Sequence, residues 1–63
     1  MWTVIYLVKG WQSVFDIRKQ LEEKDILVMT RKKTDDDNPE EAFYEVLVPQ
    51  AEVEAAQEML IGI

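Results

Sequence analysis

The stretch WTVIYLV at residues 2–8 decides the fold, because β-branched and aromatic side chains follow one another without interruption. Such a run predicts a β-strand. Regular alternation would place Val4, Tyr6 and Val8 on one face of this strand and the two residues between them on the other. Both faces are mostly apolar, so we expect the strand to be covered on both sides or paired along both edges.

An amphipathic helix is predicted after the strand, which Lys9 and Gly10 end. Ser13 is a suitable N-cap, because its hydroxyl can accept a hydrogen bond from the first turn of the helix. Val14, Ile17 and Leu21 follow at the spacing of one helical face. We therefore expect a helix of about three turns that packs its apolar stripe against a sheet.

Two more strands are predicted at residues 26–31 and 43–48, where β-branched and other apolar residues again dominate. No glycine ends the helix before them, so we expect Lys24 or Asp25 to adopt the left-handed conformation there. The polar segment at residues 32–42 contains many turn-forming residues and joins the two strands as an antiparallel hairpin.

A second helix is predicted at residues 50–60, after Pro49 has ended the third strand. Val53, Ala56 and Leu60 lie at the spacing that brings them to one face. This face is expected to pack on the same sheet as the first helix.

The order of elements is therefore β-α-β-β-α in a single domain, residues 1–63, which is an α+β fold. The crossover from the first strand to the second leaves room for the third strand between them. The three-stranded sheet is expected in the order 1-3-2, with two helices on one face. This arrangement is a ferredoxin-like unit that lacks the last strand.

The absent fourth strand predicts a homodimer, because an uncovered apolar strand edge is a site for pairing with another chain. A chain of 63 residues without cysteine has no disulfide to stabilise it, and chains of this size often depend on oligomerisation. Two copies could pair through the edges of their first strands or pack through the open faces of their sheets. The residues expected at the dimer interface are Trp2, Val4, Ile5, Tyr6 and Leu7.

The composition argues against an enzyme and predicts no catalytic residues, metal or cofactor. The chain has neither cysteine nor histidine, which removes thiol nucleophiles, histidine bases and Cys/His zinc sites. A calcium loop starting at Asp35 would need an oxygen ligand at its fifth position and glycine at its sixth. Pro39 and Glu40 occupy those positions, so the calcium motif is absent.

The charges are divided along the chain in a way that disfavours nucleic acid as a partner. Residues 1–34 carry seven bases and four acids, for +3, and residues 35–63 carry nine acids and no base, for −9, which sum to −6. The acidic half would repel a phosphate backbone. Attraction between the two arms of the hairpin is a sufficient structural reason for the pattern.

Two charged runs in the hairpin are the candidate partner-binding residues. They are the basic run Arg31, Lys32 and Lys33 and the acidic run Asp35, Asp36 and Asp37. Nothing at the start of the chain is long enough to span a bilayer, which needs about 20 apolar residues, and no basic region precedes the apolar stretch. We therefore expect a cytoplasmic protein that does not bind membranes.

Several segments resemble a family of short prokaryotic proteins of unknown function. They are MWTVIY at residues 1–6, ILV at residues 26–28 and YEVLVP at residues 44–49. These proteins are similar to a domain described as a prokaryotic signal-transducing protein, which is related to PII-like regulators. The resemblance implies that the loop between the second and third strands, residues 32–42 here, contacts partners.

The sequence thus predicts a small non-catalytic regulatory or protein-interaction module, dimeric, which uses the hairpin loop or the open sheet face. The alternative is a sensor of a small molecule or anion, similar to ferredoxin-like ligand-binding modules. In that case the anion would be held near Arg31, Lys32 and Lys33.

Overall fold

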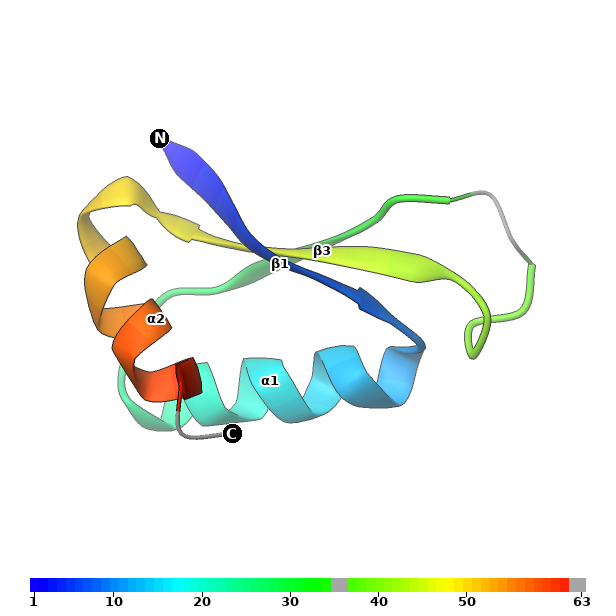
Figure 1. The fold of residues 1–63 in the computed structure, drawn as a ribbon, viewed down its shortest axis with the longest axis horizontal. Coiled ribbons are helices and arrows are strands. Elements are labelled where there is room, and N and C mark those ends of the chain that lie inside the picture. The colour runs from blue at the N-terminus through cyan, green and yellow to red at the C-terminus, as the bar shows by residue number, and fades with distance from the viewer. Residues whose placement is uncertain (35–36, 62–63) are drawn as a thin grey trace.

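A computed structural model describes residues 1–34 and 37–61, with Leu60 and Ile61 described by their backbone alone. The fold is α+β, with a three-stranded antiparallel sheet in the order β1-β3-β2 and both helices on one side of it (Figure 1). The predicted fold class, order of elements and sheet order are confirmed. The elements are β1 (Trp2–Lys9), α1 (Trp11–Glu23), β2 (Met29–Lys32), β3 (Phe43–Pro49), the 3-10 helix η1 (Gln50–Glu52) and α2 (Val53–Ile61). No helix in the described part of the chain is long and apolar enough to cross a membrane.

A β-bulge in β1 is the main irregularity of the sheet. Val4 is paired with Leu47, and Tyr6 is paired with the next residue of β3, Val46, so that Ile5 is an extra residue in the ladder. A bulge puts two residues of one strand opposite one residue of its partner and shifts the alternation of side chains beyond it.

The face assignment predicted from regular alternation in β1 is therefore wrong. Val4 and Leu7 lie on the same face, the one away from the helices, because their partners in β3 both lie there. Ile5, Tyr6 and Val8 lie on the helix side, where Ile5 and Val8 pack against the core. One extra residue has redistributed the apolar side chains of the whole strand.

The core lies between the helix side of the sheet and the two helices, in two adjoining clusters. Leu21 and Val14 of α1 are completely buried there, as is Ala56 of α2, which confirms the inward faces predicted for both helices. Val53 and Ile17 are partly buried against the same core, whereas the side chain of Leu60 lies outside the described residues. The buried members are Leu21, Ile26, Val46, Val48 and Ala56 in one cluster and Val14, Ala42 and Tyr44 in the other.

The N-cap of the first helix is Gly10, three residues before the N-cap predicted at Ser13. Gly10 has a φ of 90°, a left-handed value that side-chain-bearing residues rarely adopt. Its N–H donates to the carbonyl of Ala42 at 2.9 Å, and a Cβ at this position would lie 3.3 Å from the carbonyl oxygen of Glu40. The close approach of the hairpin loop thus sets where the helix starts.

The end of the first helix is capped by a left-handed residue, Asp25, whose φ is 60°. Asp25 is one of the two residues expected in this conformation, because no glycine follows the helix. The Asp25 N–H donates to the Glu22 carbonyl at 3.0 Å, and the Ile26 N–H donates to the Leu21 carbonyl at 3.1 Å. These two bonds form a Schellman motif, which usually includes an apolar contact between the same two outer residues. Ile26 and Leu21 belong to one buried cluster, so the cap and the core support each other.

The cap also explains why β2 is shorter than predicted. It covers Met29–Lys32 rather than residues 26–31, because Ile26 is held by the helix cap and Leu27 is 68% exposed. The last helix is also divided, into η1 and α2. The first turn is tied to the N-terminus by the Gln50 N–H, which donates to the Met1 carbonyl at 2.8 Å.

We predict that Asp25→Gly stabilises the protein by about 0.5–1 kcal/mol, because glycine adopts the left-handed conformation without steric cost. The substitution also removes a negative charge from the C-terminal end of α1, where the helix dipole disfavours it. Chemical denaturation of Asp25→Gly and of a matched Asp25→Ala control measures the effect. The alanine variant loses the same charge but keeps a Cβ, so equal stability of the two variants would contradict this account.

Candidate functional site

The face of the sheet opposite the helices is the main candidate site, and we call it the open face. Its members follow from the register of the three strands, together with the Lys33 N–H, which extends β2 by donating to the Phe43 carbonyl at 2.7 Å. The open face consists of Trp2, Val4, Leu7 and Lys9 from β1, Phe43, Glu45, Leu47 and Pro49 from β3, and Met29, Arg31 and Lys33 from β2 and its extension.

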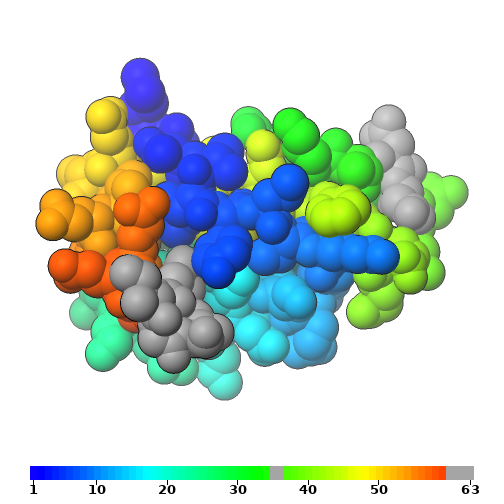
Figure 2. Space-filling model, in the orientation of Figure 1, coloured from blue at the N-terminus to red at the C-terminus, as the bar shows by residue number. Residues whose placement is uncertain are grey.

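Large apolar side chains are exposed across this face. Trp2 is 44% exposed, Val4 42%, Leu7 54% and Phe43 39%. Figure 2 shows β1, in blue, at the surface along the outer edge of the sheet. Several large apolar side chains exposed on one face of a small protein favour an interaction surface.

The centre of the open face is already excluded from water. Leu47 is only 3% exposed, yet it belongs to neither core cluster, because it lies between Val4 and Met29 on the side away from the helices. The neighbouring Glu45 is 8% exposed. The open face therefore has a dry centre surrounded by half-exposed apolar side chains.

Glu45 is held by two basic residues from the adjacent edge of the sheet. The Arg31 guanidinium donates to Oε1 through Nε at 2.7 Å and lies 2.6 Å from it through Nη2, and the Lys33 Nζ lies 3.6 Å from Oε2. The side chains of Arg31 and Lys33 stay 59% and 57% exposed, whereas that of Glu45 is 11% exposed. The acid is thus enclosed and the bases extend over it toward solvent.

The hydrogen bond from Arg31 is the main cause of a lowered pKa at Glu45, and the positive charges of Arg31 and Lys33 act in the same direction. Partial burial raises this pKa and opposes them, but the basic partners have the larger effect. Both carboxylate oxygens are occupied and the group stays ionised. Glu45 is therefore suited to hold charge inside an apolar surface rather than to transfer protons.

The structure separates the predicted partner-binding residues. Arg31 and Lys33 meet at Glu45, whereas Lys32 lies on the helix side, in register with Tyr44. Asp37 is exposed, and the predictions for Asp35 and Asp36 lie outside the described residues.

Sequence reasoning missed Glu45 as a functional residue. The acid that pairs across the hairpin with Arg31 and Lys33 lies within β3, and no contact of the described residues pairs them with the acidic arm predicted for that role. A single acid at the centre of the apolar strand FYEVLVP, opposite a basic run, is the signal that could have identified it.

The predicted dimer residues are also divided between the two faces. Trp2, Val4 and Leu7 lie on the open face, and Ile5 and Tyr6 lie on the helix side. Ile5 packs into the core, and Tyr6 borders α1, so these two are placed to support the domain itself.

The second half of the hairpin loop is tied to the rest of the domain. The Trp11 N–H donates to the Pro39 carbonyl at 3.1 Å, and the Lys9 Nζ lies 3.0 Å from the Glu41 carboxylate. The Phe43 N–H donates to the Thr34 hydroxyl at 3.2 Å at the base of the loop. These contacts fix the loop against the start of α1.

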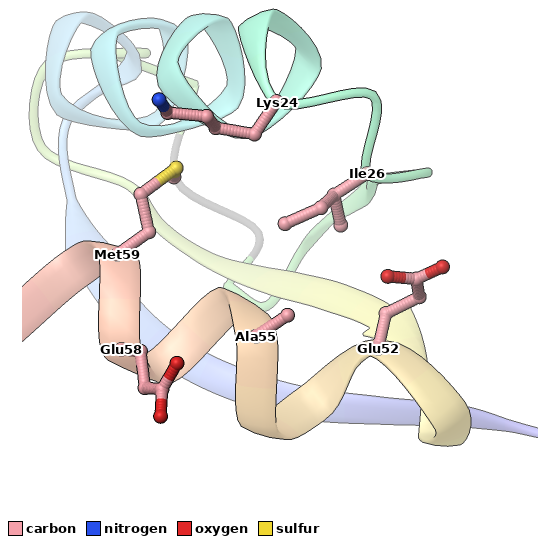
Figure 3. A pocket seen from close by; sticks show the side chains of 6 residues that line it. All are labelled: Lys24, Ile26, Glu52, Ala55, Glu58 and Met59. Atoms are coloured by element: carbon pink, nitrogen blue, oxygen red, sulfur yellow. The ribbon is translucent and has the colours of Figure 1, made fainter.

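A shallow groove of about 430 Å³ between the end of α1 and α2 is a second candidate (Figure 3). In Figure 3 the Glu58 carboxylate turns away from Lys24, and Glu52 lies at the end of the groove away from Lys24. Its polar groups do not converge on one point, as those of a ligand site would. The lining residues are Lys24, Ile26, Glu52, Ala55, Glu58 and Met59.

A third hollow, of about 370 Å³, follows the outer face of α1. Trp11 and Phe15 line it and are 42% and 50% exposed, and Trp11 makes an edge-on contact with Tyr44. The adjacent Arg18 is paired with Glu22 at 3.5 Å. This surface carries fewer large apolar residues than the open face and serves below as a control.

Comparison with known proteins finds no matching family model, no matching curated protein and no matching solved structure. Within the described ranges, no three acidic, histidine or cysteine side chains are grouped closely enough to hold a metal ion. The geometry of the open face is therefore the basis for the functional argument.

We predict that Glu45→Gln lowers the free energy of unfolding at neutral pH and that this loss shrinks in acid. The folded-state pKa of Glu45 lies below the ordinary value of 4.5, so its ionised form contributes stability above pH 4.5. That contribution is lost as the pH falls from 4.5 through the lowered pKa, where wild type and variant converge. Urea denaturation at a series of pH values measures the difference.

Glu41→Gln is the matched control for this titration, because the Lys9–Glu41 pair is 54% exposed on both sides and should contribute little. A wild-type advantage over Glu45→Gln that stays constant between neutral pH and pH 3 would show that the ion pair with Arg31 does not stabilise the fold.

Proposed function

We propose that this protein is a small, non-catalytic regulatory or protein-interaction module of the cytoplasm, and that the open face is its contact surface. The observation that carries the proposal is the group of half-exposed apolar side chains, Trp2, Val4, Leu7 and Phe43, on the face opposite both helices. Aromatic and aliphatic anchors around a desolvated centre are typical of the energetic centre of protein interfaces.

The ion pair within this surface supports the same function. An unpaired carboxylate would oppose any apolar contact, because burying a lone charge is costly. Glu45 already has its partners in Arg31 and Lys33, so a partner can cover it without leaving an unsatisfied charge. The side chains of the two basic residues are more than half exposed, which suits the polar rim of an interface.

The open face is better supported than the hairpin loop as the contact surface. Residues 37–41 of the loop are exposed and mostly polar, and this half of the loop is held against Gly10 and Trp11. The alternative of an anion sensor has weaker support, because Arg31 and Lys33 already bind the carboxylate of Glu45 and Lys32 lies on the other side of the sheet.

The non-catalytic part of the proposal rests on the state of Glu45. A general acid or base needs a free oxygen and a pKa near the working pH. Arg31 donates to Oε1 of Glu45, Lys33 lies 3.6 Å from Oε2, and these basic partners lower the pKa of Glu45. We also propose that the domain is a ferredoxin-like unit related to PII-like signal-transducing proteins. The β-α-β-β-α order of the elements and the sheet order β1-β3-β2 support this part of the proposal.

Capture from a lysate of the producing cells tests the contact surface. We expect the immobilised wild-type chain to bind a protein that Leu7→Asp loses at least tenfold, because a charge in the centre of an apolar contact is costly. Phe15→Asp is the matched control, since Phe15 is 50% exposed on α1 and Leu7 is 54% exposed on the open face. Retention of the same proteins by Leu7→Asp would reject the open face as the contact surface.

A further inference from the structure

We infer that the free edge of β2, the edge away from β3, binds an extended acidic segment of another protein, which adds to the sheet as a fourth strand. This contact is separate from the open face and goes beyond the proposed function. The main-chain groups of β2, its charges and a hollow at its start point to this occupant.

The main-chain groups of Thr30 and Lys32 point away from the sheet. β2 is an outer strand, next to β3. The Lys33 N–H donates to the Phe43 carbonyl, and the hydrogen-bonded positions of an antiparallel pair are two residues apart. Arg31 therefore also bonds to β3, whereas the N–H and C=O groups of Thr30 and Lys32 face the free edge. No backbone group elsewhere in the described ranges bonds to them, so they are available to an added strand.

β2 is better suited to such pairing than β1, the other outer strand. Its register with β3 is continuous from Met29 to Lys32, whereas β1 has its bulge between Val4 and Tyr6. A bulge interrupts the row of hydrogen-bonding groups that an added strand needs. β2 is also short and basic, and such edges resist unselective pairing. An occupant of this edge must therefore supply charges that attract lysine and arginine.

The charges of β2 and its extension select an acidic occupant. Arg31 and Lys33 share one carboxylate, that of Glu45, and their own side chains stay more than half exposed. Lys32 is exposed and, within the described residues, has no ion-pair partner. Three bases against one acid leave an excess of two positive charges here, in a chain of net charge −6. Acidic side chains on an added strand would be favourable neighbours of these bases.

A second copy of this chain does not meet these requirements. Antiparallel pairing of two β2 strands would bring the bases of one copy beside those of the other, and like charges on paired strands are destabilising. The described acids of the chain lie in the hairpin loop, within β3, or in and beside the helices, and not on a free strand edge. The occupant is therefore a segment of a different protein.

A hollow at the start of β2 selects apolar residues for one end of the segment. Its volume is about 320 Å³, and Leu27, which lines it, is 68% exposed. Glu22 and Asp25 also line it, so acidic side chains are disfavoured here. An antiparallel segment, the commoner arrangement, would place its C-terminal end at this hollow and its N-terminal end beside Lys32 and Lys33. We therefore expect acidic residues in the N-terminal half of the segment and aliphatic residues in the C-terminal half.

NMR titration of the ¹⁵N-labelled chain tests the edge. The probe is a six-residue peptide with blocked ends that carries glutamate in its N-terminal half and valine in its C-terminal half. We expect the amides of Thr30 and Lys32 to become protected from hydrogen exchange, whereas the Arg31 amide, bonded to β3, is protected already in the free chain. The same peptide with lysine in place of glutamate should bind at least tenfold more weakly, because the bases of β2 repel it.

Two pairs of variants locate the contact. Thr30→Pro should weaken binding at least tenfold, because proline removes the outward N–H but no bond to β3, and Thr30→Val, which keeps the N–H, should bind as the wild type does. Lys32→Glu should weaken binding several-fold. Its control is Lys24→Glu, because Lys24 lies in the groove beside α2 (Figure 3). Lys32→Glu and the lysine peptide provide the test should Thr30→Pro fail to fold.

Three results would overturn the inference: no binding at millimolar peptide, equal binding of the lysine peptide, or binding that leaves the amides of Thr30 and Lys32 unprotected. Peptide-induced shifts confined to the open face, and lost in Leu7→Asp, would also overturn it while supporting the proposed function. Protection of the β2 edge that Leu7→Asp leaves unchanged would support the inference even where the open face captures no protein from a lysate.

Discussion

The bulge between Val4 and Tyr6 is the constraint on which the rest of the structure depends. The first strand is apolar on both sides, and a sheet with helices on one face can bury only half of such a strand. The extra residue sends Ile5 to the core with Val8 and leaves Leu7 on the open face with Val4. One backbone irregularity therefore supplies both an inner face that completes the core and an outer face with exposed apolar side chains.

The ion pair at Glu45 allows a nearly buried carboxylate to lie on this outer face. The middle of β3 contributes Val46 and Val48 to the core and Glu45 and Leu47 to the open face. Glu45 is the residue of this segment that keeps the open face from being wholly apolar. A carboxylate that is only 8% exposed is stable there because Arg31 and Lys33 reach it from β2. The pair places two basic side chains at the β2 edge of this face.

Much of the fold could be predicted from the sequence because local patterns determine it. The inward residues Val14 and Leu21 follow from helical spacing, and the left-handed Asp25 follows from the absence of glycine at a helix end. The sheet order follows from the hairpin that joins β2 to β3 and from the crossover that leaves room for β3 between β1 and β2. The start of α1 was mispredicted because it depends on the approach of a distant carbonyl to Gly10, which no local pattern contains.

The candidate site was less predictable for the same reason. A bulge depends on how two strands pair, so the alternation within residues 2–8 could not show that Val4 and Leu7 share a face. The role of Glu45 was likewise hidden, because the acidic run at residues 35–41 offered a nearer partner for the bases in the sequence. Pairing of β2 with β3 placed Arg31 opposite Glu45 instead.

The most direct test of the account uses the absence of cysteine from the chain, since a single introduced thiol reports its own accessibility. We would measure thiol-labelling rates of Val4→Cys, Ile5→Cys and Leu7→Cys in dilute protein. The account predicts fast labelling at positions 4 and 7 and slow labelling at position 5. Fast labelling at positions 5 and 7 with protection at position 4 would show a regular strand without a bulge and would contradict the account.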